Sequence, residues 1–376
     1  METILNAGLG IGVFMFLVLL FKRGKKRSDY YFLSWILVTI GQIGFYEVTI
    51  FQFPLSGIIG VLGFALPLLS TPLLFLYLLA LTGHSISWKS VFVHLAIYPI
   101  YVITLMVLAE KNGFVLSASN GYFMPPKNAP LWMFYYAVPL AISGTTYFFL
   151  NLLLLRKHQK SIVSLFSYDE KINLKWAVYV IYASFVLFVV VSFLIFGATQ
   201  FQLFPIKNAF ALVGICSGLV LIAFGFYGFR QTTIFSNMEP LFLNDDAKAS
   251  PLEKSSYAKS GLTEAAIQQL AQKLTLHMEK EKPFLNEDLN LHLLSQQTQI
   301  PPSHLSQIIN QHFKKHFYDF VNSYRVAEAK EKICSQAHAH LSLLGIAFEC
   351  GFKSKSSFNR YFKKYTGSAP SEFRKK

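Results

Sequence analysis

Basic and polar side chains near the end of the chain recur at a spacing that places them on one face of a helix. The set comprises Lys355, Ser356, Asn359, Arg360 and Lys363. Arginine and asparagine pair with guanine and adenine, while lysine and serine bind phosphate oxygens. Residues 351–376 contain eight Lys/Arg and one acid. The pattern predicts a nucleic-acid-binding surface, and an ordinary solvated helix face is the alternative interpretation.

The neighbouring residues predict a helix, a tight turn and a second helix that positions this face. A buried stripe at helical spacing consists of Leu343, Ile346, Ala347 and Cys350. Gly351 supplies the backbone freedom for the turn, and Ser354 is expected to cap the second helix. The inward side chains of that helix are predicted to be Phe358, Phe362 and Tyr365. A solvated face explains the charges but not the cap, turn and stripe together.

A weak internal repeat places a second copy of this unit upstream. Gln299–Ile300 match Gly351–Phe352 at a separation of 52 residues, and later pairs are 53 apart. The first copy predicts the same arrangement of a helix, a turn and a second helix. Lys314 of the first copy stands where the second copy has Gly367.

The stretch "GIAFECGFKSKSSFNRYFKKYTGSAPSEFR" closely resembles the C-terminal signature of AraC/XylS-type transcription regulators. The first copy resembles their first motif and connecting helix, with Arg325 and Ala329 at familiar places. The resemblance covers residues 284–375. It implies that each motif lays its second helix in a major groove, so that one chain reads two grooves roughly 34 Å apart.

The resemblance implies a first reading helix over residues 302–313, capped at Ser303. We expect Lys314 to contact phosphate instead of ending this helix cleanly. The first reading helix is nearly uncharged, which leaves most of the phosphate attraction to the second copy.

The resemblance also implies that two helix-turn-helix motifs, near 289–313 and 341–366, supply the candidate DNA-binding residues. The first motif contributes Ser303, His304, Ser306, Gln307, Asn310, Gln311 and Lys314. The second contributes Ser354, Lys355, Ser356, Asn359, Arg360, Lys363 and Lys364.

The first 229 residues have a different composition. They hold 14 Lys/Arg and six Asp/Glu, against 20 and 14 in the rest of the 376-residue chain. Apolar runs of the length that crosses a bilayer lie at 3–21, 31–51, 57–81, 91–108, 131–155, 176–196 and 209–229. The sequence thus predicts an all-α protein, with a seven-helix transmembrane bundle followed by a cytoplasmic all-α domain of two helix-turn-helix motifs joined by a central helix.

The expected domains are a transmembrane region over 1–229, a linker over 230–260 and an AraC-type DNA-binding domain over 261–376. Within the last, Thr263 is expected to cap an amphipathic helix. Its apolar stripe is predicted to pack on the following domain, or failing that on a second chain. The whole layout resembles seven-span AraC-type regulators of Bacteroidetes-like bacteria.

Charges in the loops predict the orientation. Alternate loops contain 11 Lys/Arg, and the opposite set contains three. Because basic loops stay in the cytoplasm, the N-terminus is expected outside and the C-terminal domain inside. The chain is thus predicted to be a multi-pass protein of the bacterial inner membrane. Glu2 precedes the first apolar run and "KRGKK" follows it, an order that fits a retained span better than a signal peptide.

Polar and small residues inside the spans are the remaining features of this half. Glu47 is the only acidic residue inside a predicted span, and Gln42 lies just over one helical turn before it. Acidic residues inside a membrane are functional candidates. Both are candidates for sensing a small or lipophilic signal, although Glu47 could instead reach interfacial water. The seventh span contains Gly214, Gly218 and further glycines that are expected to allow close helix contact.

These features predict a membrane-embedded, one-chain transcription regulator that binds double-stranded DNA and lies in a lipid bilayer. If a shift among the predicted spans changes the spacing of two C-terminal domains, the protein is expected to be a homodimer on repeated DNA half-sites. The alternative is a transporter or receptor whose tail is regulatory. An enzyme such as a sensor kinase is not expected, because the tail lacks a Gly-rich phosphate loop. The cysteines Cys216, Cys334 and Cys350 have no metal-ligand spacing, and we expect no cofactor or metal.

Overall fold

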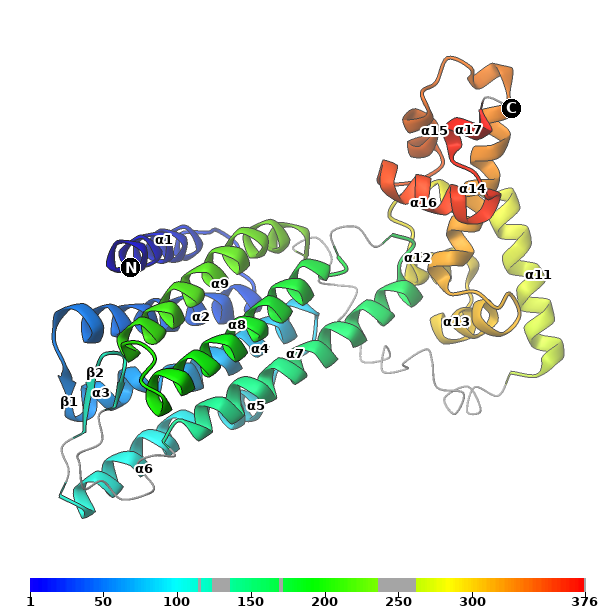
Figure 1. The fold of residues 1–376 in the computed structure, drawn as a ribbon. Coiled ribbons are helices and arrows are strands. Elements are labelled where there is room, and N and C mark those ends of the chain that lie inside the picture. The colour runs from blue at the N-terminus through cyan, green and yellow to red at the C-terminus, as the bar shows by residue number, and fades with distance from the viewer. Residues whose placement is uncertain (114–115, 124–135, 169–171, 236–261, 375–376) are drawn as a thin grey trace. The chain divides into compact units, whose positions relative to one another are not determined.

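The computed structural model describes residues 1–113, 116–123, 136–168, 172–235 and 262–374. They form two compact units (Figure 1). Unit 1 comprises Met1–Leu155 and Leu174–Leu243, and unit 2 comprises Arg156–Asn173 and Asn244–Lys376. Residues 236–260 of the predicted linker and 131–135 of the fifth predicted span lie outside the described residues. The prediction of an all-α fold is confirmed.

Unit 1 is built from nine helices among the described residues. They are α1 (Glu2–Leu20), α2 (Arg27–Glu47), α3 (Gly57–Phe64), α4 (Pro67–Leu81), α5 (Trp88–Leu95), α6 (Ile97–Lys111), α7 (Val138–Leu165), α8 (Lys175–Gln200) and α9 (Ile206–Phe235). Helix α7 extends beyond unit 1, since its last ten residues belong to unit 2.

Seven helical segments in the described residues are long and apolar enough to cross a membrane, as the sequence predicts. The third combines α3 with α4, and the fourth combines α5 with α6. The break between α3 and α4 falls just before Pro67, which lacks the N–H that a continuous helix would need. The long apolar segments are therefore predictable from composition, but the joints inside them depend on single residues.

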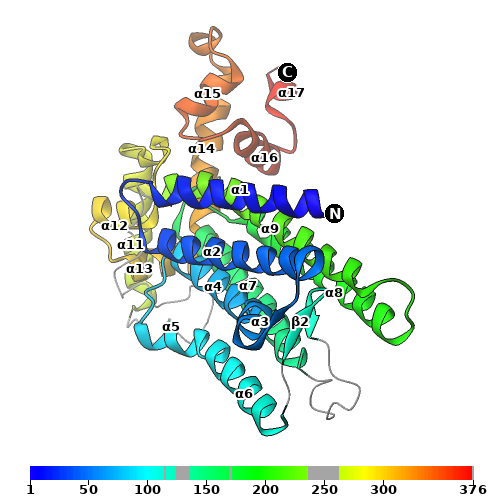
Figure 2. The same cartoon turned by 90° about the vertical axis from the view of Figure 1, so that its left-hand side faces the viewer.

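Close helix packing in unit 1 depends on small residues. Helix α1 lies beside α2 in Figure 2, and both also contact α9. A Cβ on Gly218 of α9 would lie 3.8 Å from the Cα of Gly8, and one on Gly225 would lie 1.2 Å from Met15 Cε. The predicted role of the glycines in the seventh span is thus confirmed. Aromatic stacking adds to the core, with the ring centroids of Phe32 and Tyr77 separated by 4.5 Å.

A small antiparallel sheet was not expected. Its strands are β1 (Leu55–Ser56), β2 (Ser117–Ser119) and β3 (Tyr122–Phe123), in the order β1-β2-β3. Asn120 and Gly121 form the turn between β2 and β3, and both have positive φ, at 53° and 88°. Asn-Gly is the preferred sequence of such a two-residue turn. The hairpin therefore had a sequence signal, which its very short strands obscured.

Unit 2 contains the helices of the two predicted motifs. They are α11 (Glu264–Lys280), α12 (Leu291–Thr298), α13 (Pro302–Gln311), α14 (Phe317–Cys334), α15 (Leu343–Glu349), α16 (Lys355–Thr366) and α17 (Pro370–Phe373), with 3₁₀ turns at Pro283–Leu285 and Gln336–His338. Figure 1 shows α14 running between the two motifs. Its Phe320 packs with α12 and α13, and its Val326 packs with α15 and α16. One central helix thus carries two cores.

The helix before the motifs packs on the domain that follows it. Thr263 caps α11, with its hydroxyl accepting from the Ala266 N–H at 3.3 Å. Its apolar stripe is buried and includes Ala271, Leu274 and Met278. Both predictions, the cap and the packing of the stripe on the domain, are confirmed.

Cys350 and Cys334 should differ strongly in reactivity. Cys350 is fully buried, as predicted for a small core residue, and burial raises the pKa of its thiol to about 12. Cys334 is exposed. Because the thiolate is the nucleophile, we expect iodoacetamide at neutral pH to modify Cys334 in the native chain and Cys350 only after unit 2 unfolds. Peptide mass spectrometry after timed labelling checks this. Equal labelling rates in the native chain would contradict the buried position of Cys350.

Candidate nucleic-acid interface

The second motif is a capped helix pair around a glycine turn. Ser342 caps α15 by accepting from the Gly345 N–H at 3.0 Å, and Ser354 caps α16 by accepting from the Ser357 N–H at 3.2 Å. Gly351 has φ of +82°, a left-handed conformation that glycine adopts at no steric cost. The caps and the turn together fix the angle at which α16 leaves α15. The predicted cap at Ser354 and turn at Gly351 are confirmed.

The two faces of α16 differ sharply in polarity. Phe358, Tyr361 and Phe362 are buried. Tyr361, not Tyr365, completes the inward face: Tyr365 is 37% exposed, so its predicted inward position is wrong. The reason is a tertiary contact: the Tyr365 hydroxyl donates to the Asp319 carbonyl of α14 at 3.0 Å, which keeps the ring at the edge. The exposed side chains of α16 include Lys355, Ser356, Asn359, Arg360, Lys363 and Lys364.

Two of these cations are held in place by helix α14. Arg360 Nη2 donates to the Tyr318 hydroxyl at 2.7 Å, and its guanidinium lies 5.3 Å from the centroid of the Tyr361 ring. Lys364 Nζ forms an ion pair with Asp319 at 2.6 Å. Each contact fixes a long side chain that would otherwise lose rotamer freedom on binding a ligand. The outer face of α16 is therefore partly pre-organised.

The first motif repeats this design with different turn residues. Helix α12 ends at Gln299, whose φ is +55°, and Gln299 aligns with Gly351 in the internal repeat. Lys314, which aligns with Gly367, also has positive φ, at 52° against 79° for the glycine. The two motifs thus share a positive φ at both aligned positions, although the first motif has no glycine there. Lys314 is exposed.

The start of α13 differs from the prediction. The helix begins at Pro302, as expected, but its N-cap residue is Pro301, and no side chain caps it. Ser303 lies inside the first turn and is exposed, so its predicted role as the cap is wrong. Proline at the first helical position provides the fixed φ that starts the helix without such a cap.

Most candidate residues of α13 reach the surface, with one exception. Ser303 and Gln311 are exposed, while His304, Ser306 and Asn310 are half-buried. Gln307 is only 4% exposed, so it does not share their outward face. Its amide nitrogen donates to Gln311 Oε1 at 3.1 Å. Gln307 is better placed to orient Gln311 than to contact a ligand itself.

The charge of the interface comes mainly from the second motif. Among described side chains, α13 carries no Lys or Arg, whereas α16 carries Lys355, Arg360, Lys363 and Lys364. Lys353 in the turn before α16 is ion-paired with Asp288. Phosphate neutralisation dominates affinity for nucleic acid. The cations suited to it lie on α16, whereas α13 offers neutral donors and acceptors.

A buried arginine joins the two motifs. Arg325 of α14 is 1% exposed and ranks among the largest fully buried side chains described. Its Nε donates to the Phe284 carbonyl at 2.7 Å, and its Nη2 donates to the Asn286 carbonyl at 2.8 Å. The sequence indicated this residue only by resemblance, since burial of an arginine has no periodic signal. Its guanidinium also lies 5.9 Å from the centroid of the Phe352 ring, so its contacts reach the second motif.

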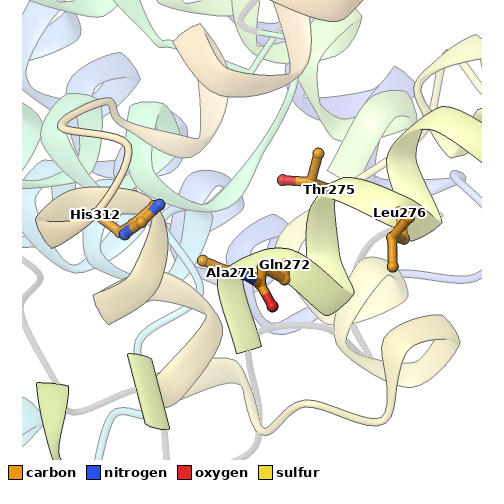
Figure 3. A pocket seen from close by; sticks show the side chains of 5 residues that line it. All are labelled: Ala271, Gln272, Thr275, Leu276 and His312. Atoms are coloured by element: carbon orange, nitrogen blue, oxygen red, sulfur yellow. The ribbon is translucent and has the colours of Figure 1, made fainter. Parts of the chain in front are cut away.

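A shallow pocket lies beside α11. Its lining consists of Ala271, Gln272, Thr275, Leu276 and His312. Figure 3 shows His312, just after α13, across from Ala271 and Thr275 of α11. Gln272, Thr275 and His312 are the polar residues of this lining. The described residues contain no cluster of His, Cys, Asp or Glu suited to a metal.

The candidate sensing residues of unit 1 are both buried. Gln42 is 8% exposed and Glu47 is 6% exposed. The Glu47 carboxylate accepts twice from Gln52 Nε2, at 2.8 and 3.0 Å. Gln52 ends a π-helix, Val48–Gln52, that directly follows α2. Such π-helical insertions are frequent at functional sites. The carboxylate therefore lies within the packed unit and does not reach out to solvent.

Comparisons with known proteins match the C-terminal part of the chain. Residues 294–376 match a helix-turn-helix domain family, which identifies an AraC-type helix-turn-helix domain at the C-terminus. An uncharacterised HTH-type transcriptional regulator of Staphylococcus aureus (strain COL) is 29% identical over 116 residues. That segment spans 31% of this chain and 14% of the staphylococcal protein. No solved structure matches the chain.

Proposed function

We propose that the chain is a membrane-embedded, one-component transcription regulator, in which unit 1 senses a signal and unit 2 binds promoter DNA sequence-specifically. The observation that carries the proposal is the exposed basic face of α16. Helix α13 occupies the equivalent position in the first motif, with neutral polar residues, and the central helix α14 lies between the two motifs. A pair of helices on one domain suits two successive major grooves. The match of residues 294–376 to a helix-turn-helix family supports it.

The proposal places the seven apolar helices in the bacterial inner membrane. Their lengths and hydropathy support it. The excess of Lys/Arg in alternate loops supports an outer N-terminus and a cytoplasmic unit 2. That side of the membrane is also where promoter DNA lies. Two chains on repeated half-sites form the proposed assembly.

Gln42 and Glu47 are the proposed sensing residues of unit 1. Both are buried polar groups in an apolar environment, where such groups are costly and are therefore functional candidates. The signal would be a small or lipophilic molecule that competes with Gln52 for the Glu47 carboxylate. The adjoining π-helix supplies a backbone that can return to α-helical bonding when this contact changes.

Lys363→Ala and Asn359→Ala should affect DNA binding in different ways. Lys363 offers a charge to phosphate, so its loss should weaken binding to all duplexes and lower the slope of log affinity against log salt by about one. Asn359 suits an adenine edge, so its loss should relax preference at one base pair by about 1–3 kcal/mol. The measurement is fluorescence anisotropy of the full chain in nanodiscs, with duplexes that it selects from a random pool.

Lys273→Ala is the matched control. Lys273 is an exposed lysine of α11, away from both reading helices in sequence, and its removal subtracts the same charge. Binding should stay close to wild type. Affinity that does not change between 50 and 200 mM salt, where about 10³–10⁵-fold losses are usual for 6–10 phosphate contacts, would contradict DNA binding by this surface.

A further inference from the structure

One segment of unit 2 comes from the loop between two apolar helices. Unit 2 includes Arg156–Asn173, although the residues on either side of this segment belong to unit 1. Helix α7, Val138–Leu165, contributes its first part to unit 1 and its last ten residues to unit 2. We name residues 156–168 the coupling segment. Apolar helices precede and follow this segment in the chain. Among the described parts of unit 2, it is the only one with such a position.

Ser167 anchors the coupling segment to the start of the first motif. Its N–H and its Oγ both donate to the Leu289 carbonyl, at 3.3 and 2.5 Å. Phe166 pairs with Asn290 as an isolated β-bridge. Asn290 is also the N-cap of α12. The segment is therefore bonded directly to the residue that begins the first helix of the motif.

Ser167 also completes the environment of the buried arginine. Arg325 Nη1 donates to the Ser167 carbonyl and Nη2 to its Oγ, both at 3.1 Å. Asn322 Nδ2 donates to the same carbonyl at 3.1 Å. Ser167, Asn322 and Arg325 are all at most 1% exposed. Buried polar groups depend on such partners, so Ser167 supplies acceptors that α14 needs.

The segment also contacts the second motif. Val163 packs against the core that holds Ile346 and Phe358, while Leu165 packs against the core of the first motif. Lys353, in the turn before α16, lies 3.7 Å from the centroid of the Tyr168 ring. A single short segment thus touches both cores, the central helix and the turn before α16.

We propose that the coupling segment is the element through which unit 1 sets the relative position of the two reading helices. Ser167 is its positioning residue, bound by Arg325 and Asn322 where the motifs meet. Because α7 carries this segment at its end, a shift of α7 changes the contacts of both motifs together. The proposal rests on the proposed function, since it supplies the route by which a signal in unit 1 reaches the DNA-binding helices.

The test measures coupling in the full chain, held in phosphatidylcholine nanodiscs, by hydrogen–deuterium exchange with and without a selected duplex. Coupling between sites is reciprocal, and about 5–150-fold is typical. DNA binding should therefore change exchange in residues 138–155 of α7 by at least about fivefold in the wild-type chain. Inserting four glycines between Leu155 and Arg156 should remove that change while DNA affinity stays close to wild type.

Two serine variants separate positioning from general damage. Ser167→Ala removes the hydroxyl that binds Arg325, and we expect it to weaken the effect of DNA on residues 138–155 severalfold. Ser161→Ala is the matched control, because the Ser161 hydroxyl bonds only to the Lys157 carbonyl within the same helix. It should leave the effect unchanged.

The outcomes distinguish the two proposals. If the wild-type chain binds its duplex with normal salt dependence but residues 138–155 exchange at the same rate with and without DNA, the coupling is overturned and the DNA-binding function stands. If Ser167→Ala and Ser161→Ala behave alike, the assignment of Ser167 is overturned. If the full chain selects no duplex at all, the proposed function fails, and the coupling proposal fails with it.

Discussion

Replacing Gly351 by alanine should destabilise the second motif by roughly 2–5 kcal/mol. A left-handed backbone costs an alanine about 1–2 kcal/mol. The added Cβ would also lie 2.4 Å from the Phe284 carbonyl oxygen and 2.8 Å from that of Leu285. Overpacking of this kind costs about 1–3 kcal/mol. The Phe284 carbonyl cannot move away freely, because it accepts from Arg325.

Gly367→Ala is the matched control for this prediction. Gly367 has nearly the same φ, +79°, but no atom lies within 4 Å of the position of its Cβ. Only the backbone term of about 1–2 kcal/mol therefore applies. The measurement is alkylation of Cys350 in the full chain across a urea series, since this buried thiol reports opening of unit 2. Equal urea midpoints for the two variants would contradict the predicted clash.

Arg325→Met should be the second severe change, at roughly 3–5 kcal/mol. Methionine is shorter and has no donors, so the Phe284 carbonyl would lose its arginine partner. The Asn286 carbonyl would keep only the Leu289 N–H, and the Ser167 carbonyl only Asn322. Hydrogen bonds made by a charged group contribute about 1.5–3 kcal/mol each. Relaxation of the surrounding residues recovers part of the sum. The same urea series, read at Cys350, measures the loss.

Arg374→Met provides the comparison for a connecting arginine at the surface. Arg374 also donates to two backbone carbonyls, those of Leu341 and Ala339, at 2.8 and 2.9 Å. Its side chain is only half-buried, so water can replace the lost donors. We expect a loss of about 1 kcal/mol or less. A larger effect at position 374 than at 325 would show that burial does not determine the strength of these contacts.

The apolar helices and the repeated motif could be predicted from sequence because each has a strong local pattern. A run of about 20 apolar residues needs no tertiary context. The second motif combined a cap at Ser354, a turn at Gly351 and a stripe that includes Ile346. All three are confirmed. Each of these features acts within a few residues, which is why the sequence alone indicates them.

The errors in the site arise where tertiary contacts decide between equivalent positions. Gln307 and Asn310 are both polar residues of one short helix, and burial of Gln307 depends on packing that the helical period does not specify. Tyr361 and Tyr365 are one turn apart, and the contact of Tyr365 with Asp319 decides which one stays at the edge. Proline can start a helix without a side-chain cap, which explains Ser303.

The role of the coupling segment had no sequence signal. Ser167 bonds to residues more than 120 positions away, and most of these bonds run to or from backbone groups. Backbone groups are present at every position and so form no pattern of residue types. A loop between two apolar helices also has the polar composition expected of any such loop. Only the fold brings these residues together.

The origin of Ser167 has a practical consequence for dividing the chain. A cut anywhere between residues 230 and 260 separates the C-terminal polypeptide from the apolar helices, but it does not yield a complete domain. The fragment would begin after Ser167 and would therefore lack the carbonyl and hydroxyl to which the buried Arg325 donates. Expression of such a fragment should include residues 156–168, supplied as a fused or added peptide. The folded domain thus includes residues that lie outside the continuous C-terminal segment of the sequence.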